Sequence, residues 1–270
     1  MPPTLSVRLA AVAGLVPDCR RLIDVGTDHA LLPIALVAAG RCAKALARDL
    51  RPGPVAVARR NVARARLSDR IAMEIADGLE GLACTRDDVV VVAGLGGLET
   101  ADILDRSPTA AHSARMLVLQ PMKSLPDLRR FLQRSWFLVE REDLVRDTGR
   151  FYIALRCRPL DPQERPEPVL DELEALLGRD LLARRPALLK EYAAWIRRRL
   201  EKECRGLSRS DGPEDRTGFS ERQALIARID ALTYNEYAFR ADRTAAGGVP
   251  KGPARGKSGL HRARVPGSSR

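Results

Sequence analysis

The chain has 270 residues, 45% of them apolar, which is enough to bury the core of one large domain with an appendage. No segment reaches the ~18 consecutive apolar residues of a membrane span, and the first residues lack the basic-then-apolar order of a secretory signal, so we expect a cytoplasmic protein. The net charge of +11 favours a polyanion such as nucleic acid as partner, although a bias toward arginine codons explains it equally well.

Cysteine usage argues against a disulfide framework and a zinc ribbon, because the five residues are scattered and form no C-x-x-C pair. We expect no metal and predict that most of the cysteines are small buried side chains. They are Cys19, Cys42, Cys84, Cys157 and Cys204.

Strand and helix patterns alternate in the first half of the chain. An amphipathic helix is expected at the start, with Leu5, Leu9 and Val12 on one face and Ser6 near its cap. Short apolar runs then predict strands over 22–25, 43–50, 71–76, 89–93 and 116–119. Helical spacing predicts helices over 30–39, 55–67, 98–104 and 126–136.

Two further strands, over 137–145 and 151–157, are joined by the hairpin signal Asp147-Thr148-Gly149. Five strand-helix units followed by an antiparallel pair predict an α/β fold. We expect a doubly wound, mostly parallel, seven-stranded Rossmann-like sheet with a reversed strand near one edge.

The rest of the chain has a different pattern. Four prolines between 159 and 168 mark a hinge, and two amphipathic stripes, over 188–200 and 225–237, predict an antiparallel helical hairpin with its loop at 208–213. From residue 244 the Gly/Pro/Arg/Ser composition predicts a disordered basic tail. We therefore divide the chain into 1–158, 159–243 and 244–270.

Polar residues follow the predicted parallel strands where each strand ends, which is where ligands bind in open α/β sheets. Asp24, Gly26, Asp28 and His29 follow the first strand and Asp49 ends the second. The third strand leads to Asp77-Gly78 and the fourth to Gly94-Leu95-Gly96-Gly97.

This order favours an adenosyl ligand that carries an amino acid. A dinucleotide needs G-x-G-x-x-G, but Asp28 stands where the second glycine would be. A carboxylate there repels a pyrophosphate and attracts a ligand ammonium. Asp49 can accept from both ribose hydroxyls and Asp77 from the adenine amine, as in a class I S-adenosylmethionine site.

Each of these residues also has a purely structural interpretation. Asp28 could cap the helix that starts near Ala30, and His29 could be a first-turn residue without a ligand. Asp49 could simply pair with a nearby arginine, and Asp77 could be a turn residue. Four polar signals at four successive strand ends favour the binding site.

Several strings in this order, "DVGTDHALLPIAL", "VVAGLGG", "LVLQP" and "GRFYIAL", resemble the bacterial tRNA (adenine-22, N1) methyltransferase family, TrmK. The motif similarity runs from Ser6 to Leu155. It implies a class I methyltransferase that transfers a methyl group from S-adenosylmethionine to N1 of a tRNA adenine. It also implies a cofactor pocket formed by Asp24, Gly26, Asp28, His29, Asp49, Asp77, Gly78, Ala93 and Gly94.

The resemblance places Leu95, Gly96 and Gly97 against the target base, with Gln120, Tyr152 and Asp28 as the expected catalytic contacts. Because the loop after the fourth strand lacks an Asn or Asp acceptor, it suits a ring nitrogen, whose lone pair is already available. We expect in-line transfer without a metal or a covalent intermediate. The arginines expected to hold RNA phosphates are Arg51, Arg59, Arg60, Arg64, Arg184, Arg185, Arg197 and Arg198.

Leu31, Met122 and Ile153 depart from the residues usual in the family, Tyr, Asn and Glu respectively, on the substrate side of the pocket. They leave a divergent or non-catalytic RNA-binding protein as one alternative. An NAD-linked oxidoreductase is disfavoured by the missing glycines, and a hydrolase by the three histidines and the absent G-x-S-x-G turn. We expect a monomer.

Overall fold

The computed structural model describes residues 3–208 and 213–245. Its described residues up to Asp230 form one compact unit, and residues 231–245 continue helix α10 in a second unit. Residues 246–270, and so nearly all of the predicted basic tail, lie outside the described part, as does most of the predicted loop at 208–213. No helix among the described residues is long and apolar enough to cross a membrane.

All seven predicted strands are present, and each agrees with its predicted range to within three residues at either end. They are β1 (Cys19–Val25), β2 (Cys42–Asp49), β3 (Ile71–Ile75), β4 (Asp88–Ala93), β5 (Met116–Gln120), β6 (Phe137–Asp147) and β7 (Arg150–Pro159). The predicted helices are α1 (Val7–Leu15), α2 (Leu31–Ala38), α3 (Pro52–Arg64), α4 (Gly97–Arg106), α6 (Leu125–Arg134), α9 (Leu189–Leu207) and α10 (Pro213–Ala245).

The strand order is β3-β2-β1-β4-β5-β7-β6, with β7 antiparallel to both of its neighbours. This confirms the predicted doubly wound sheet with a reversed strand next to one edge. Thr148 and Gly149 form the β6–β7 turn with φ values of 46° and 80°. Two successive positive φ values are what a type I′ hairpin turn requires.

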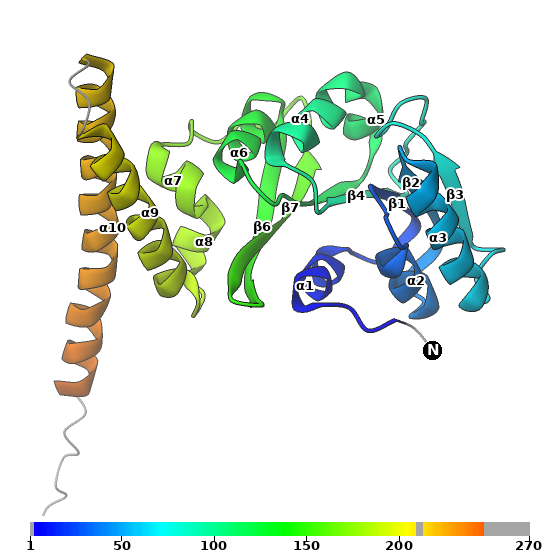
Figure 1. Cartoon of the computed structure of the whole chain (residues 1–270), viewed down its shortest axis with the longest axis horizontal. Coiled ribbons are helices and arrows are strands. Elements are labelled where there is room, and N and C mark those ends of the chain that lie inside the picture. The colour runs from blue at the N-terminus through cyan, green and yellow to red at the C-terminus, as the bar shows by residue number, and fades with distance from the viewer. Residues whose placement is uncertain (1–2, 209–212, 246–270) are drawn as a thin grey trace, which may run out of the picture. The chain divides into compact units, whose positions relative to one another are not determined.

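Helices cover both faces of the sheet. Figure 1 shows α1, α2 and α3 on one face and α4, α5 and α6 on the other. Val12 of α1, Ile34 of α2 and Val91 of β4 belong to one buried cluster on the first face. Ser6 caps α1 as predicted, because its hydroxyl accepts from the backbone N–H of Leu9 at 3.3 Å.

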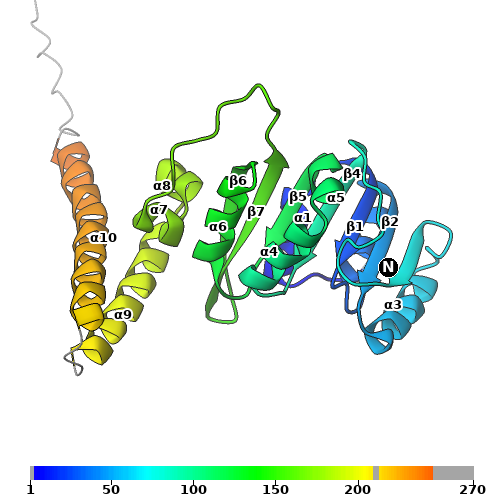
Figure 2. The same cartoon turned by 90° about the horizontal axis from the view of Figure 1, so that it is seen from above.

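Three short helices were not predicted: α5 (Pro108–Ser113), α7 (Glu172–Leu177) and α8 (Arg179–Arg184). Six residues are too few for a 3.6-residue period to be recognised. The start of α7 nevertheless had a readable signal, because Asp171 and Glu174 form a capping box. In Figure 2, α7 and α8 lie beside α6 and the edge strand β6.

The helical hairpin is confirmed by two ion pairs between α9 and α10. Arg197 pairs with Asp230, and Arg222 pairs with Glu203, a pattern that fits antiparallel helices. Trp195, predicted on the packing stripe, is 37% exposed. It stacks on Tyr192, and its ring centroid lies 6.1 Å from that of Phe151 at the β6–β7 hairpin.

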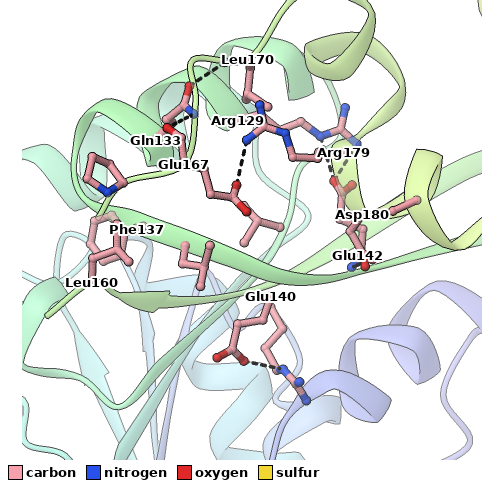
Figure 3. Close-up of a pocket in the computed structure, with 15 residues that line it drawn as sticks. Arg129, Gln133, Phe137, Glu140, Glu142, Leu160, Glu167, Leu170, Arg179 and Asp180 are labelled. Atoms are coloured by element: carbon pink, nitrogen blue, oxygen red, sulfur yellow. Dashed lines mark hydrogen bonds and ion pairs between the residues drawn. The ribbon is translucent and has the colours of Figure 1, made fainter. Parts of the chain in front are cut away.

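A buried ion pair anchors α7 and α8 to the edge of the sheet (Figure 3). Arg129 and Glu142 are 2% and 1% exposed, and Arg129 Nη2 lies 2.7 Å from Glu142 Oε1. Arg129 also donates to the carbonyl of Ala175 at the end of α7. On α8, Asp180 accepts from the backbone N–H of Glu142 and Arg184 donates to its carbonyl. These contacts occupy backbone groups that an edge strand would otherwise expose.

We expect Arg129→Met to lower the free energy of unfolding by about 3–5 kcal/mol, because it leaves the Glu142 carboxylate buried without its cation. Urea denaturation measures the change. Arg130→Met is the matched control, since Arg130 pairs with Asp127 and Glu172 at the surface and should contribute less than about 1 kcal/mol. Equal losses in the two variants would contradict the anchoring role.

Candidate active site

Two adjoining cavities lie at the carboxyl ends of the central parallel strands. The larger, of about 450 Å³, is lined by residues after β1 and β4 and by α1. The smaller, of about 390 Å³, is lined by residues after β2 and β3 and by α4. Because Gly26, Asp49, Arg51 and Leu95 line both, we treat them as one strand-end cleft.

The predicted cofactor residues all line this cleft. Those on the larger cavity are Asp24, Gly26, Asp28, His29, Asp49, Ala93 and Gly94, and those on the smaller include Asp77 and Gly78. Several predicted substrate or catalytic residues line neither cavity. These are Gly96, Gly97, Gln120, Tyr152, Arg59 and Arg60.

Asp24 is a buried carboxyl group at the end of β1, only 4% exposed. Thr27 Oγ1 donates to Asp24 Oδ2 at 2.6 Å. Burial raises the pKa of Asp24 to about 7; the Thr27 hydrogen bond opposes this increase, and the negative charge of Asp49 adds to it. A cation bound beside Asp24 would therefore favour its ionised form near neutral pH.

The loop after β1 is held to β2 by its backbone. Gly26 has a φ of 72°, and the N–H groups of Gly26 and Thr27 both donate to the carbonyl of Arg48. Asp28 and Ala30 also have positive φ, and α2 starts without a side-chain cap. The alternative in which Asp28 caps this helix is therefore wrong. Asp28 Oδ2 instead lies 3.3 Å from His29 Nε2, with both side chains more than half exposed.

Asp49 is buried at the end of β2 and pairs with a nearby arginine, Arg51, as its structural interpretation predicts. Its Oδ1 accepts from the backbone N–H of Arg51 at 2.9 Å and lies 3.5 Å from Arg51 Nε. Both contacts are made by Oδ1. Asp49 therefore pairs with Arg51 and lines the cleft at the same time.

Asp77 is held by Arg106, whose Nη1 and Nη2 each donate to one carboxylate oxygen at 3.1 Å. Arg106 also pairs with Asp102 and Glu80. An adenine amine bound at Asp77 would share the Asp77 carboxylate with the Arg106 guanidinium. Next to it, a Cβ on Gly78 would lie 2.8 Å from Ile103 Cγ2, and Gly78 has a φ of 52°, so only glycine fits this corner of the cleft.

The glycine loop after β4 packs against the loop after β5. Gly94 has a φ of 87°, and a Cβ on Gly97 would lie 2.3 Å from the carbonyl oxygen of Ser124. Gly97 N–H donates to Lys123 O, and Gly96 N–H to Glu99 at the start of α4. Gly97 thus allows the close approach to Ser124, and the N–H groups of Gly96 and Gly97 are used in hydrogen bonds, while Leu95 lines the cleft.

Gln120 and Tyr152 do not line the cleft, but both contact Arg8, a cleft residue that the sequence did not predict. Gln120 is 1% exposed, and its Oε1 accepts from Arg8 Nη1 at 2.6 Å. The Arg8 guanidinium carbon lies 6.0 Å from the centroid of the Tyr152 ring, and Arg8 itself lines the larger cavity. Arg8 had one readable signal, since it is the single charged residue in α1.

The predicted phosphate-binding arginines fall into two groups. Arg184 and Arg197 are paired within the protein, to Asp180 and to Glu201 and Asp230. Arg51 is exposed but lies against Asp49. The remaining predicted arginines are exposed and form no ion pair with another described residue. These are Arg59, Arg60, Arg64, Arg185 and Arg198.

The three departures from the family pattern lie at different depths. Leu31 lines the larger cavity, Met122 is 47% exposed with its sulfur 3.7 Å from Gln120 Nε2, and Ile153 is buried in β7. Only Leu31 therefore changes the wall of the cleft directly.

Comparison with known proteins gives consistent matches. Residues 5–155 match the methyltransferase domain family. Over 151 residues the chain is 30% identical to the tRNA (adenine(22)-N(1))-methyltransferase of Bacillus subtilis, covering 56% of this chain and 63% of the relative's length. A crystal structure of a putative tRNA (m1A22) methyltransferase from Streptococcus pneumoniae, in complex with S-adenosyl-L-methionine, is 30% identical, with a TM-score of 0.68 over 86% of this chain and 99% of the other.

The B. subtilis tRNA methyltransferase TrmK is 23% identical to this chain and has the same fold, with a TM-score of 0.75 over 85% of this chain and 98% of that one. The strand order, the antiparallel β7 and the strand-end cleft define a class I S-adenosylmethionine-dependent methyltransferase fold. The match over residues 5–155 covers more than half of the chain. Within this class, the chain belongs to the TrmK family.

The raised pKa of Asp24 predicts a pH-dependent stability of the free protein. Because the folded state binds this proton more tightly than the unfolded state, the stabilisation is complete below about pH 4 and is lost as the pH rises through about 7. Asp24→Asn should therefore stabilise the protein relative to wild type by an amount that grows from pH 5 to pH 8, up to about 4 kcal/mol.

Urea denaturation of both proteins across this pH range measures the difference. Asp87→Asn is the control, because its carboxylate is 61% exposed and its partner Arg20 keeps its charge over this pH range. A pH-independent difference for Asp24→Asn would contradict the role of burial.

Proposed function

We propose that this chain transfers a methyl group from S-adenosylmethionine to N1 of an adenine in tRNA, adenine-22 by family resemblance. The observation that carries the proposal is the strand-end cleft, where three carboxylates, Asp24, Asp28 and Asp49, stand in place of a phosphate-binding glycine loop. Carboxylates in these positions suit a ligand with a sulfonium and an ammonium group.

The residues present fit this cofactor in three respects. Asp24 is a buried carboxyl group for which a neighbouring cation favours ionisation. Asp49 lies between the two cavities, a position suited to the ribose hydroxyls. Asp77 and Gly78 line the smaller cavity, which suits the adenine. When bound, the cofactor supplies an electrophilic methyl group on its sulfur.

The chain's own contribution to transfer is positioning and exclusion of water. Leu95 lines both cavities and provides an apolar wall between the β1 and β4 loops. No carboxylate or amide follows β4 in the Ala93–Gly97 stretch, and N1 of adenine needs none because its in-plane lone pair is free. Asp28, more than half exposed at the cleft mouth, is the proposed polar contact to the base.

Gln120 is proposed to act through Arg8 rather than directly on the base, because its side-chain carbonyl is occupied by the Arg8 guanidinium. Tyr152, under the same guanidinium, is proposed to do likewise. For the RNA, the exposed arginines Arg59, Arg60 and Arg64 on α3 offer a basic face without a carboxylate in the helix. A paired target adenine would have to be extruded to reach the cleft.

A second candidate is an RNA-binding protein that retains the fold without catalysis. Leu31 favours it, because an aliphatic side chain lines the cavity where the family usually has an aromatic ring that can stack on a base.

The decisive experiment incubates the purified chain with tRNA transcripts and S-adenosylmethionine labelled in its methyl group. We expect label in the RNA at N1 of an adenine, mapped by reverse-transcription stops, and lost when that adenine is replaced by guanine. Binding of both S-adenosylhomocysteine and tRNA without methyl transfer would favour the non-catalytic candidate. Failure to bind S-adenosylhomocysteine would overturn the proposed function.

Replacing Arg59, Arg60 and Arg64 by Gln should reduce the slope of log Kobs for tRNA against log salt by about 0.7–0.9 for each phosphate that the variant no longer neutralises. Filter binding over a range of salt concentrations measures it. The matched control replaces Arg20, Arg130 and Arg222 by Gln, because these three exposed or half-buried arginines pair with carboxylates. An equal change in both triple variants would show only the effect of net charge.

A further inference from the structure

The strands β1 and β2 each begin with a cysteine, and the two thiol groups are in contact. Cys19 opens β1, Cys42 opens β2, and the two residues are partners in the parallel β1–β2 register. Their Sγ atoms lie 3.2 Å apart. The strand-end cleft lies at the carboxyl ends of these strands, whereas the thiol pair lies at their amino ends, so the methyl-transfer site does not account for it.

The two thiols differ in their access to solvent. Cys42 is 0% exposed, whereas Cys19 is partly exposed. The remaining cysteines, Cys84, Cys157 and Cys204, are all buried. Cys19 is therefore the cysteine that a small reagent in solution reaches most easily, and it has a second thiol directly beside it. An accessible thiol next to a second, resolving thiol is the usual arrangement of cysteines that are oxidised reversibly.

The surroundings of Cys19 favour its thiolate form. The hydrogen bond with the Cys42 thiol lowers the pKa of Cys19; burial opposes this, and the positive charge of Arg115 adds to the decrease. The carboxylates of Asp18 and Asp88 act in the opposite direction and contribute least. The same hydrogen bond, together with burial, raises the pKa of Cys42. Cys19 is thus the sulfur that ionises first, and the thiolate is the nucleophilic form of cysteine.

The backbone geometry of the pair allows a covalent bond between the two sulfur atoms. Disulfides join residues whose Cα atoms are about 4.4–6.8 Å apart, and register partners on neighbouring strands lie about 4.8 Å apart. The sulfur atoms must approach by about 1.2 Å, from 3.2 Å to the bonded distance of about 2.0 Å. Both cysteines are at the first position of a strand, where small side-chain rotations can close this gap.

We propose that Cys19 and Cys42 form an oxidisable dithiol, a modification site that a hydroperoxide converts to an intramolecular disulfide. The Cys19 thiolate attacks one oxygen of hydrogen peroxide, the O–O bond breaks, and a sulfenic acid and hydroxide are formed. The hydroxide removes the proton of Cys42. The Cys42 sulfur then attacks the Cys19 sulfur, and the S–O bond breaks as hydroxide leaves.

The steps balance. The second hydroxide takes up a proton equal to the one that Cys19 released on ionising, so the two thiols lose two electrons and two protons. Hydrogen peroxide is reduced to two molecules of water. Because Cys42 is already in contact with Cys19, it captures the sulfenic acid before a second peroxide can oxidise it irreversibly. Cleft residues take no part in these steps, so the dithiol chemistry does not depend on the proposed function.

The test treats the reduced full-length protein with equimolar hydrogen peroxide, blocks the remaining thiols by alkylation, and identifies the products by intact-protein and peptide mass spectrometry. We expect the protein to lose the mass of two hydrogen atoms, a cross-linked peptide pair that contains Cys19 and Cys42, and full recovery of both thiols with dithiothreitol. Survival of both thiols, or a disulfide that joins other cysteines or two chains, would overturn the proposal.

Two variants separate the attacking sulfur from the resolving one. In Cys42→Ser we expect the sulfenic acid of Cys19 to persist and to be trapped by dimedone, whereas Cys19→Ser should give no adduct on the buried Cys42. Cys204→Ser is the matched control, because it removes a buried cysteine of α9 and should keep the wild-type cross-link. Equal dimedone labelling of Cys19 and Cys42 would contradict the assigned roles. The cross-link itself is measured on the unaltered chain, so the test does not depend on the folding of either variant.

Discussion

The parallel pairing of β1 with β2 on one side and with β4 on the other determines where the carboxyl groups after β1 and β2 and the glycine loop after β4 lie. Asp24 is in register with Ala47 of β2 and Val91 of β4, so the loops that follow these strands leave the sheet at one edge. The N–H groups of Gly26 and Thr27 extend the β1–β2 ladder by bonding to Arg48 O. This backbone pairing brings together residues that are far apart in sequence.

The same pairing creates the electrostatic character of the cleft. The strands are apolar and buried, so a carboxyl group at their end is desolvated, and the pKa of Asp24 rises. Arg8 enters from a helix on one face of the sheet and is held by Gln120 at the end of β5. Carboxylates and a guanidinium thereby face one cavity while remaining separate, which is the arrangement that a zwitterionic ligand complements.

A buried ion pair at the edge of the sheet serves the fold instead of the cleft. Arg129 and Glu142 join α6 to β6 and connect both to the end of α7. The two charge sites differ in one physical respect. Arg129 and Glu142 form an ion pair with each other, whereas Asp24 and Arg8 line a cavity of about 450 Å³ and keep hydrogen-bonding capacity for a ligand.

The prediction from sequence was most accurate where a single local signal decided the structure. Short apolar runs located the parallel strands, period-3.6 patterns located the longer helices, and Asp147-Thr148-Gly149 located the hairpin turn. Six-residue helices such as α7 carried too little periodicity. Trp195 lay on a helical stripe but is 37% exposed, although its ring stacks on Tyr192. Asp28, a sensible cap in the sequence, caps nothing because Ala30 adopts a left-handed conformation.

The sequence by itself determined the order of strands and helices, the family and the residues that follow each strand, since these depend on neighbours in the chain. Only the tertiary structure decided which side chains share a cavity and which charges neutralise each other. It paired Arg106 with Asp77 and Arg129 with Glu142, and it brought Arg8 to Gln120, 112 residues away. Such pairings depend on distances across the sheet, and no pattern along the chain encodes them locally.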